Sequence, residues 1–182
     1  MLAALQPGMR FVDIGAHIGF QSMLGAELVG KSGRVVLFEP QRQILQYTKQ
    51  NLEPYPQVRC MASAVGDNAG AVTFYERDMA TAGFSGSDLS GGGQNQSARQ
   101  YTVPVVTLDE ALRADERPVD FIKCDVEGAE MSVLRGAGSI LNMDRPLLVL
   151  EAEMPVKGEP RPRIQEFREF LEPLGYRPIA FE

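Results

Sequence analysis

Cysteine is scarce in this chain of 182 residues, which contains only Cys60 and Cys124. The two lie far apart and form no Cys-x-x-Cys pair, the spacing that is typical of zinc sites. We therefore expect no zinc site. Buried free thiols, in a protein of a reducing compartment, are the better interpretation.

An excess of positive charge is also lacking. The chain has 18 Lys and Arg against 24 Asp and Glu, which gives a net charge of −6. Proteins that bind bulk nucleic acid need a basic face for the phosphates, so we expect no nucleic-acid partner. A small neutral or cationic substrate remains compatible with this charge.

Long apolar runs are absent as well. No stretch approaches the roughly 18 apolar residues of a membrane span, and the start of the chain lacks the pattern of a signal peptide. We expect no membrane span and a cytoplasmic location. Hydrophobic residues make up 44% and charged residues 23% of the chain. This composition and length predict a single globular domain over residues 1–182.

What the sequence does contain is a series of short apolar runs that alternate with helix-like segments. Strands of a main sheet are predicted at residues 10–14, 34–39, 58–65, 119–125, 146–151 and 176–181. Helices are predicted at residues 17–29, 40–52, 107–112, 130–135 and 164–171. Continuous apolar strands between helices indicate an α/β fold, with a doubly wound, mostly parallel, Rossmann-like sheet covered on both faces.

The middle of the chain departs from this alternation. Residues 72–76 and 101–106 are predicted to form an antiparallel excursion between the third and fourth strands of the main sheet. Residues 78–100 include a polar Gly/Ser-rich tract that cannot bury enough apolar surface to fold alone. We expect a mobile loop there, over the acceptor side of a site.

The first predicted strand ends in an unusual set of residues, within FVDIGAHIGF at residues 11–20. In doubly wound sheets, ligands bind beyond the carboxyl ends of the strands. The glycines Gly15 and Gly19 do not match the G-x-G-x-x-G pattern of dinucleotide sites, because the second close glycine is missing. Asp13 would repel a phosphate and attract an ammonium group. A cofactor with an amino-acid end therefore fits better than NAD.

Two further strand ends extend this candidate site. Glu39 follows the second strand about 20 residues after Gly19, where an acidic side chain can bind both ribose hydroxyls. The alternative for Glu39 is a helix-start acid favoured by the helix dipole. Residues 63–67 (SAVGD) end the third strand, where an adenine wall would lie, although a simple Gly-Asp turn explains Gly66 and Asp67 equally well.

Several segments, in this order, resemble the FkbM family of S-adenosylmethionine-dependent methyltransferases. They are FVDIGAHIGFQS, VVLFEP, SAVGD, VTLDEAL, VDFIKCDVEGAEMSVLRGAGSIL and RPLLVLEAE, which together span residues 11–153. The glycine motif alone indicates only the broad class I methyltransferase fold. The block KCDVEGAE, with LDE upstream of it, is much more specific to the family.

The resemblance implies a function and a set of site residues. Members of the family typically methylate hydroxyl groups of sugars, polysaccharides or natural products, so a small-molecule or glycan acceptor is expected. S-adenosyl-L-methionine would be the cofactor, and His17 would pack near it rather than act as a base. By position, the cofactor-binding residues would be Asp13, Gly15, His17, Gly19 and Glu39, with Ala64 and Val65 beside adenine.

A second acidic set lies at the ends of the fourth and fifth predicted strands. Asp125 ends the fourth and Glu151 the fifth, and these strands are expected to be neighbours. Their carboxylates could bind the cofactor's ammonium, act as a general base, or hold Mg²⁺, an alternative that we do not favour. We expect Asp125 beside the methionine end and the reacting hydroxyl, with Glu127 and Glu151 as base or substrate clamp. Glu130 is expected to be a solvated helix-start acid.

The sequence departs from the family pattern at both ends, since the helices that often precede the first strand and a seventh strand are missing. We expect either a fragment, or a second copy or partner domain that completes the site. A non-catalytic cofactor-binding module is therefore one alternative. An NAD(P)-linked oxidoreductase is another, disfavoured by the missing glycine and by the absence of a Tyr-x-x-x-Lys pair. No Asn-Pro-Pro-Tyr-like segment follows the fourth strand, which argues against methylation of nucleobase amines.

Overall fold

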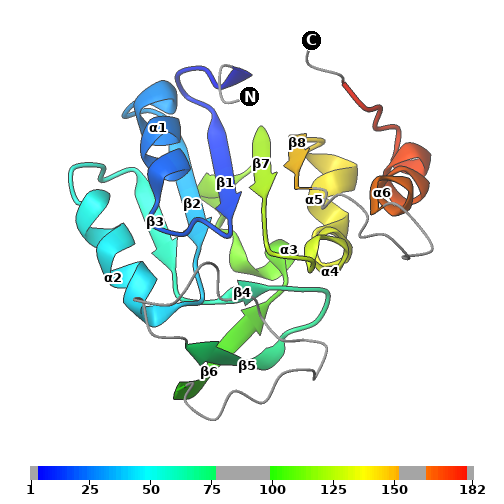
Figure 1. The fold of residues 1–182 in the computed structure, drawn as a ribbon. Coiled ribbons are helices and arrows are strands. Elements are labelled where there is room, and N and C mark those ends of the chain that lie inside the picture. Colours follow the sequence, from blue (N-terminus) through cyan, green and yellow to red (C-terminus); the bar gives the residue numbers. More distant parts are fainter. Residues whose placement is uncertain (1–3, 77–98, 152–162, 180–182) are drawn as a thin grey trace.

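The computed structural model describes residues 4–76, 99–151 and 163–179, and Figure 1 shows their arrangement. The main sheet has five parallel strands in the order β3-β2-β1-β7-β8. Their bounds are β1 Arg10–Ile14, β2 Arg34–Phe38, β3 Val58–Met61, β7 Phe121–Cys124 and β8 Leu147–Leu150. The chain runs outward from β1 in one direction and then in the other, so the switch point lies between β1 and β7. The predicted doubly wound parallel sheet is confirmed.

Helices cover both faces of this sheet (Figure 1). They are α1 Phe20–Val29, α2 Arg42–Asn51, α3 Leu108–Ala111, α4 Glu130–Arg135, α5 Gly138–Met143 and α6 Arg163–Leu171. Two short 3-10 turns, η2 Ala114–Glu116 and η3 Glu172–Leu174, complete the helical elements between β6 and the end of the described chain. None of the helices in the described part of the chain has the length and apolar character needed to cross a membrane.

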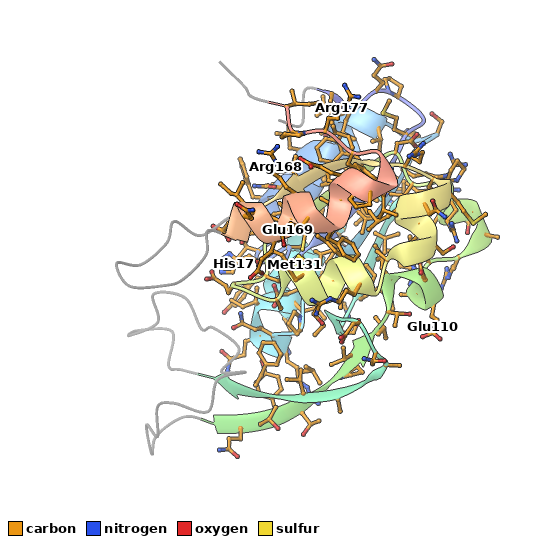
Figure 2. All side chains as sticks on the ribbon, turned by 90° about the vertical axis from the view of Figure 1, so that its right-hand side faces the viewer. His17, Glu110, Met131, Arg168, Glu169 and Arg177 are labelled. Atoms are coloured by element: carbon orange, nitrogen blue, oxygen red, sulfur yellow. The ribbon has the colours of Figure 1, made fainter. Side chains whose placement is uncertain are left out.

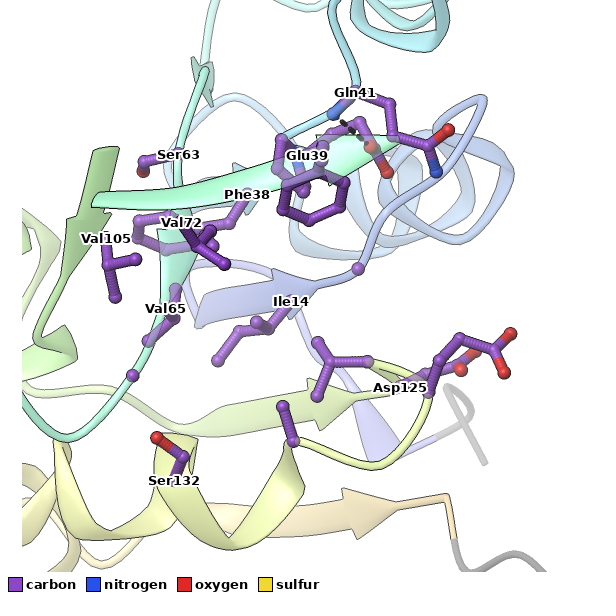
Figure 3. A pocket seen from close by; sticks show the side chains of 18 of the residues that line it. Ile14, Phe38, Glu39, Gln41, Ser63, Val65, Val72, Val105, Asp125 and Ser132 are labelled. Atoms are coloured by element: carbon purple, nitrogen blue, oxygen red, sulfur yellow. Dashed lines mark hydrogen bonds between the residues drawn. The ribbon is translucent and has the colours of Figure 1, made fainter. Parts of the chain in front are cut away.

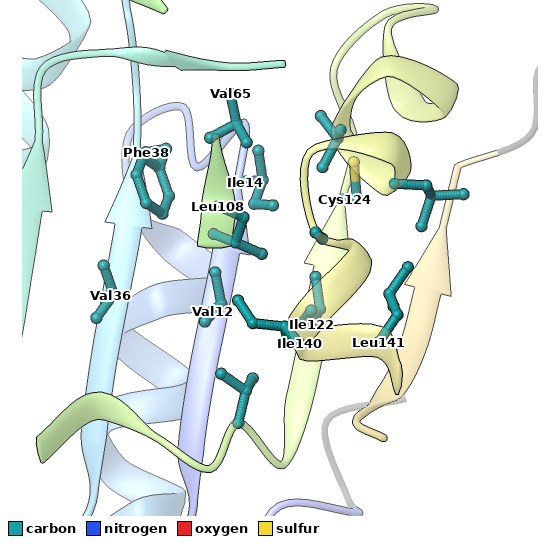
Figure 4. Close-up of a cluster of buried hydrophobic side chains, with 14 of the residues drawn as sticks. Val12, Ile14, Val36, Phe38, Val65, Leu108, Ile122, Cys124, Ile140 and Leu141 are labelled. Carbon is teal, nitrogen blue, oxygen red and sulfur yellow. The ribbon is translucent and has the colours of Figure 1, made fainter. Parts of the chain in front are cut away.

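Alternation along the strands decides which helix packs on which face. Phe11, Val35 and Phe121 pack with α1, and Leu37 packs with α2. The opposite face carries the larger core, which is drawn in Figure 4 and packs against α3, α4, α5 and α6. Its sheet residues are Val12, Ile14, Val36, Phe38, Ile122 and Cys124. Each such buried side chain contributes about 1.5–3 kcal/mol relative to exposure, so both helix layers are held mainly by this sheet.

Figure 2 looks at the molecule from the α6 side and shows this helix lying over α4 and α5. Phe167 and Leu171 turn into the core, whereas Arg168 and Glu169 are exposed. Both cysteines are free, with Cys124 buried and Cys60 half-buried. The predicted free thiols are thus confirmed, although only Cys124 is fully covered.

A second, three-stranded sheet holds the predicted excursion. It consists of β4 (Ala64–Val65), β5 (Gly70–Glu76) and β6 (Arg99–Val106) in the order β4-β6-β5. The predicted antiparallel pairing of β5 with β6 is confirmed, and both strands begin two residues earlier than predicted. The single strand predicted at residues 58–65 is wrong, because β3 ends at Met61 and β4 belongs to the second sheet.

Other boundaries also differ from the predictions. Helix α1 begins at Phe20 rather than residue 17, because His17 and Gly19 have left-handed backbone with φ of 51° and 83°. Helix α5 was not predicted. Residues 176–179 form no strand, and Pro178 lacks the N–H that a sheet ladder needs. The Tyr176 hydroxyl instead donates to the carbonyl of Leu141 in α5. The tract at residues 78–100 lies outside the described residues, apart from the first two positions of β6.

The LDE segment of the sequence has a structural role in this fold. Asp109 lies in α3 and accepts hydrogen bonds from two backbone amides at the start of α5, those of Ser139 at 2.8 Å and Ile140 at 3.0 Å. Thr107 caps α3 itself by accepting from the amide of Glu110. The segment therefore joins two helices and does not line the cavity described below.

Candidate functional site

A cavity of about 490 Å³ opens at the carboxyl ends of β1, β2 and β7, between the main sheet and the second sheet (Figure 3). This volume lies within the range of about 300–1,000 Å³ that is usual for small-molecule sites. The position is the one expected for a ligand of a doubly wound sheet, beside the switch point between β1 and β7. The residues around it therefore define the candidate site.

The loop after β1 can approach β7 only because Gly15 has no side chain. Gly15 has φ of 76°, and a Cβ built there would lie 1.8 Å from the carbonyl oxygen of Asp125. Its amide donates to the carbonyl of Phe38 at 3.0 Å, which fixes the loop against β2 as well. Gly15 lines the cavity, as the sequence predicts for a glycine at this strand end.

Glu39 lies at the end of β2 in the cavity wall. Its two carboxylate oxygens accept hydrogen bonds from the amides of Gln41 at 2.7 Å and His17 at 2.9 Å. Burial raises the pKa of Glu39, and the two backbone N–H groups oppose this rise. A carboxylate oxygen can accept more than one hydrogen bond, so both oxygens keep capacity for a ligand's hydroxyl groups.

His17 also lines the cavity, and its left-handed backbone is held from both sides. Its amide is bound by Glu39, and its carbonyl accepts from the hydroxyl of Thr48, a fully buried residue of α2. Sequence reasoning missed Thr48, because a threonine within a helix carries no signal that a distant loop needs it. The loop that presents His17 is thus built by α2 and Glu39 together.

Two of the predicted cofactor residues lie behind the cavity wall. Asp13 is completely buried, and its oxygens contact the Ser22 hydroxyl at 2.6 Å and the Lys123 ammonium at 3.4 Å. A Cβ at Gly19 would lie 2.9 Å from Thr48 Cγ2, so this glycine lets the loop pack on α2. This corrects the expectation that the Asp13 carboxylate faces an ammonium group of a ligand, because that carboxylate is completely buried and does not line the cavity.

The apolar part of the cavity comes from both sheets. Ala64 and Val65 line it, at the position predicted for an adenine wall. Val72 of β5 and Val105 of β6 face them, which the sequence did not indicate because the excursion could not be placed relative to the main sheet (Figure 3). The buried Ser63 hydroxyl borders the same space and has no hydrogen-bond partner among the described residues.

Asp125, Glu127 and Glu151 come together, as predicted. Each offers one carboxylate oxygen, and these oxygens all lie within 4.8 Å of one another. The parallel pairing of Cys124 with Leu150 places the following residues, Asp125 and Glu151, side by side. Asp125 and Glu127 line the cavity, while Glu151 stands next to them. Three oxygens at this spacing could share a proton or hold a divalent cation.

The two neighbouring carboxyl groups differ in their affinity for a proton. The hydrogen bond with Asp125, assisted by burial and by the charges of the nearby acids, raises the pKa of Glu151 to about 7. Burial works to raise the pKa of Asp125, but the hydrogen bond from Glu151 and the charge of Lys123 outweigh burial and lower that pKa. Near neutral pH, Asp125 is therefore ionised and Glu151 holds the shared proton part of the time.

Glu130 is not the solvated acid that the sequence suggested. It is 2% exposed, and its Oε1 accepts from the amides of Val126 and Gly128, both at 3.1 Å. These bonds hold the loop in which Glu127 takes a left-handed backbone with φ of 52°. Glu130 thus shapes the segment that presents Glu127 to the cavity.

Lys123 is a further residue that sequence reasoning missed. It is 5% exposed on β7 and contacts Asp13, Gly15 and Asp125. The signal was a lysine within the otherwise apolar segment FIKC, since a lysine is almost never fully buried unless it is paired.

Comparison with known proteins places this geometry in context. The sequence profile of the methyltransferase FkbM domain matches residues 13–178. The protein-L-isoaspartate O-methyltransferase of Aeropyrum pernix is 39% identical over 64 residues, which are 35% of this chain and 25% of that protein. The similarity to this relative thus spans about a quarter of its length.

Three solved structures share the fold over nearly the whole chain. Precorrin-6y C5,15-methyltransferase from Geobacter metallireducens GS-15 has a TM-score of 0.56 and 17% identity, over 97% of this chain and 68% of its own. Aeropyrum pernix fibrillarin, with natively bound S-adenosyl-L-methionine, has a TM-score of 0.55 and 12% identity, over 93% of this chain and 58% of its own. A SAM-dependent methyltransferase from Aquifex aeolicus has a TM-score of 0.50 and 15% identity, over 96% of this chain and 75% of its own. At these identities the likeness shows the fold alone, whereas the family profile covers most of the sequence. The chain belongs to the methyltransferase FkbM domain family.

Proposed function

We propose that this protein is an S-adenosylmethionine-dependent O-methyltransferase that acts on a hydroxyl group of a sugar, a polysaccharide or a natural product. The observation that carries the proposal is the pair of acidic groups that flank the end of β1 within one cavity. Glu39 follows β2 and Asp125 follows β7. Membership of the FkbM methyltransferase family supports the same reaction.

The cavity residues fit the parts of this cofactor. Glu39 offers two oxygens for the ribose hydroxyls, and Ala64 and Val65 offer an apolar surface for adenine. Asp125 offers a carboxylate for the ammonium group of the cofactor. Gly15 has no side chain, so the methionine part of the cofactor can lie close to the protein backbone there. When bound, S-adenosylmethionine supplies a methyl group on a positively charged sulfur.

The acidic cluster of Asp125, Glu127 and Glu151 would bind the acceptor and remove the proton of its reacting hydroxyl. An aliphatic hydroxyl is a poor nucleophile unless a base takes its proton as it reacts. Glu127 or Glu151 is the proposed base, because both lie beside Asp125 in the cluster, and the pKa of Glu151, at about 7, is well matched to this task at neutral pH. Asp125 stays ionised and orients the reacting groups, and such alignment can contribute roughly 7–11 kcal/mol to a barrier.

Calorimetry with S-adenosylmethionine, S-adenosylhomocysteine and NAD tests the cofactor, and methyl release with a panel of hydroxyl-bearing acceptors tests the reaction. We expect S-adenosylmethionine and S-adenosylhomocysteine to bind and NAD not to bind. We also expect methyl transfer to at least one sugar or polyketide-like alcohol. Binding without transfer to any acceptor of the panel would favour a non-catalytic cofactor-binding module. Binding of NAD in place of S-adenosylmethionine would overturn the proposal.

Replacing Glu39 with alanine should weaken binding of S-adenosylhomocysteine by about 1.5–3 kcal/mol, because a charge-assisted and bidentate contact to the ribose is lost. The amides of His17 and Gln41 also lose their acceptor, which adds to the effect. Calorimetry on the variant measures the loss. Glu53→Ala, at an exposed acid away from the cavity, is the matched control and should bind normally. Unchanged affinity in Glu39→Ala would remove Glu39 from the site.

The Glu151 carboxyl should titrate near pH 7, and its pKa should fall toward the usual range when Asp125 is replaced by asparagine. The reason is that asparagine removes both the negative neighbour and the carboxylate that accepts the Glu151 proton. NMR titration of ¹³C-labelled glutamate carboxyl groups measures this without any acceptor. If Glu151 is the base, turnover on an identified acceptor should rise as the pH increases through the same range. A titration near 4.5 in the unmodified protein would contradict the shared proton.

A further inference from the structure

Lys123 is a buried cation at the centre of the main sheet. It stands on β7 directly beside Asp13 of β1 in the parallel register, so both side chains project to the same face, where Asp13 meets Ser22 of α1. Lys123 is 5% exposed and Asp13 is completely buried. A buried ammonium is costly unless charges and hydrogen bonds compensate for lost water, so its contacts reveal its role.

Three oxygens surround the ammonium. Nζ donates a hydrogen bond to the Gly15 carbonyl at 2.8 Å and lies 3.2 Å from Asp125 Oδ2. It also lies 3.4 Å from Asp13 Oδ1, which is a charge contact without the geometry of a hydrogen bond. Of the three partners, Gly15 and Asp125 line the cavity and Asp13 lies behind it. Lys123 therefore links the hidden carboxylate to two groups that face a ligand.

A stabilising role alone does not explain this arrangement. A pair of apolar residues of similar volume is often as stable as a buried ion pair. Unlike an apolar side chain, the Lys123 ammonium contacts both loops at once. It binds the Gly15 carbonyl in the loop after β1 and the Asp125 carboxylate in the loop after β7, and so fixes the distance between these two groups. The close contact of Gly15 with the Asp125 backbone brings these two loops together, and Lys123 sets the positions of their polar groups.

We propose that Lys123 is a positioning residue that shapes the part of the cavity that receives the amino-acid end of S-adenosylmethionine. This inference rests on the function proposed above. Lys123 keeps the Gly15 carbonyl and the Asp125 carboxylate in place, and its own charge is screened from the cavity by those same groups. The ribose end is held separately, because the Glu39 carboxylate is fixed by the amides of His17 and Gln41.

Two probes separate the ends of the site. S-adenosylhomocysteine carries the amino-acid end, whereas 5′-methylthioadenosine has the same nucleoside and thioether but lacks that end. In Lys123→Met, which keeps the length of the side chain without the charge, the affinity for S-adenosylhomocysteine should fall at least tenfold. The affinity for 5′-methylthioadenosine should change less than twofold. Calorimetry measures both, and Lys31→Met, at an exposed lysine in the turn before β2, should change neither.

A second variant guards against loss of folding, since Lys123→Met leaves the Asp13 carboxylate buried without its cation. Asp13→Asn combined with Lys123→Met removes both buried charges and should show the same selective loss for S-adenosylhomocysteine. Restored S-adenosylhomocysteine affinity in this double variant would show that Lys123 only neutralises Asp13, and would overturn the proposal. An equal loss for both probes, or tighter binding of S-adenosylhomocysteine, would also overturn it. If the unmodified protein binds neither probe, the proposed function is wrong, and the inference about Lys123 is wrong as well.

Discussion

Replacing Gly15 with alanine should destabilise the protein by about 2–5 kcal/mol and abolish binding of S-adenosylhomocysteine. A non-glycine residue in left-handed backbone costs about 1–2 kcal/mol, and forcing an atom into a packed site typically costs about 1–3 kcal/mol more. The obstacle is the backbone of Asp125, 1.8 Å from the new Cβ, which cannot rotate aside as a side chain would. The loop after β7 must therefore move, and it carries the acidic groups away from the cavity.

Denaturant unfolding and calorimetry on Gly15→Ala measure the two effects. Gly30→Ala is a sharp control, because Gly30 also has positive φ, of 64°, but a Cβ there would meet nothing within 4 Å. Its ψ of −172° lies in a backbone region that is essentially limited to glycine, so this control should lose only a backbone cost of about 1–3 kcal/mol and keep its ligand affinity. If the two variants are equally stable and bind equally well, the close approach of Gly15 to Asp125 is not required.

The second large effect is expected on turnover. Replacing the base, by Glu127→Gln or by Glu151→Gln, should reduce turnover by about 10²–10⁴-fold on an acceptor identified by methyl release. Asp125→Asn should also reduce turnover, because it removes the ionised carboxylate that orients the reacting groups. The affinity for S-adenosylhomocysteine should change little in Glu127→Gln, and more in Asp125→Asn if that carboxylate binds the ammonium. Thermal unfolding checks that the fold is intact.

The same assay distinguishes a metal-free reaction from a metal-dependent one. The carboxylates of Asp125, Glu127 and Glu151 could hold Mg²⁺ instead of acting as a base, and EDTA would then stop the reaction until Mg²⁺ is restored. We expect EDTA to have no effect. Near-normal turnover in Asp125→Asn, Glu127→Gln and Glu151→Gln alike would show that these carboxylates are structural and that the mechanism is wrong.

The parallel sheet could be predicted from the sequence because strands buried on both faces read as short continuous apolar runs between helices. The split between β3 and β4 could not, since residues 58–65 contain no glycine or proline and nothing local shows that the chain changes sheets after Met61. The start of α1 was missed for a similar reason. His17 takes a left-handed backbone only because Glu39 and Thr48, both distant in sequence, hold its amide and carbonyl.

The candidate site was partly predictable on the same grounds. Glu39, Asp125 and Glu151 could be placed together because the carboxyl ends of parallel strands meet at one edge of a sheet. The sequence alone predicts that Asp13 faces the ligand, because nothing local indicates that Ser22 and Lys123 are its partners in the folded chain. The sequence predicts a solvated Glu130, because the acceptor role of this residue toward the amides of Val126 and Gly128 leaves no pattern in the sequence.

The pairing of β1 with β7 affects the order of events during protein synthesis. Gly15 and Lys123 are separated by 108 positions, which a ribosome needs roughly 5–20 s to add. Until β7 emerges, the Asp13 carboxylate has no cation and favours hydration over burial against α1. The nascent N-terminal half is therefore expected to remain open, with its apolar strands accessible to chaperones and proteases, until the lysine arrives.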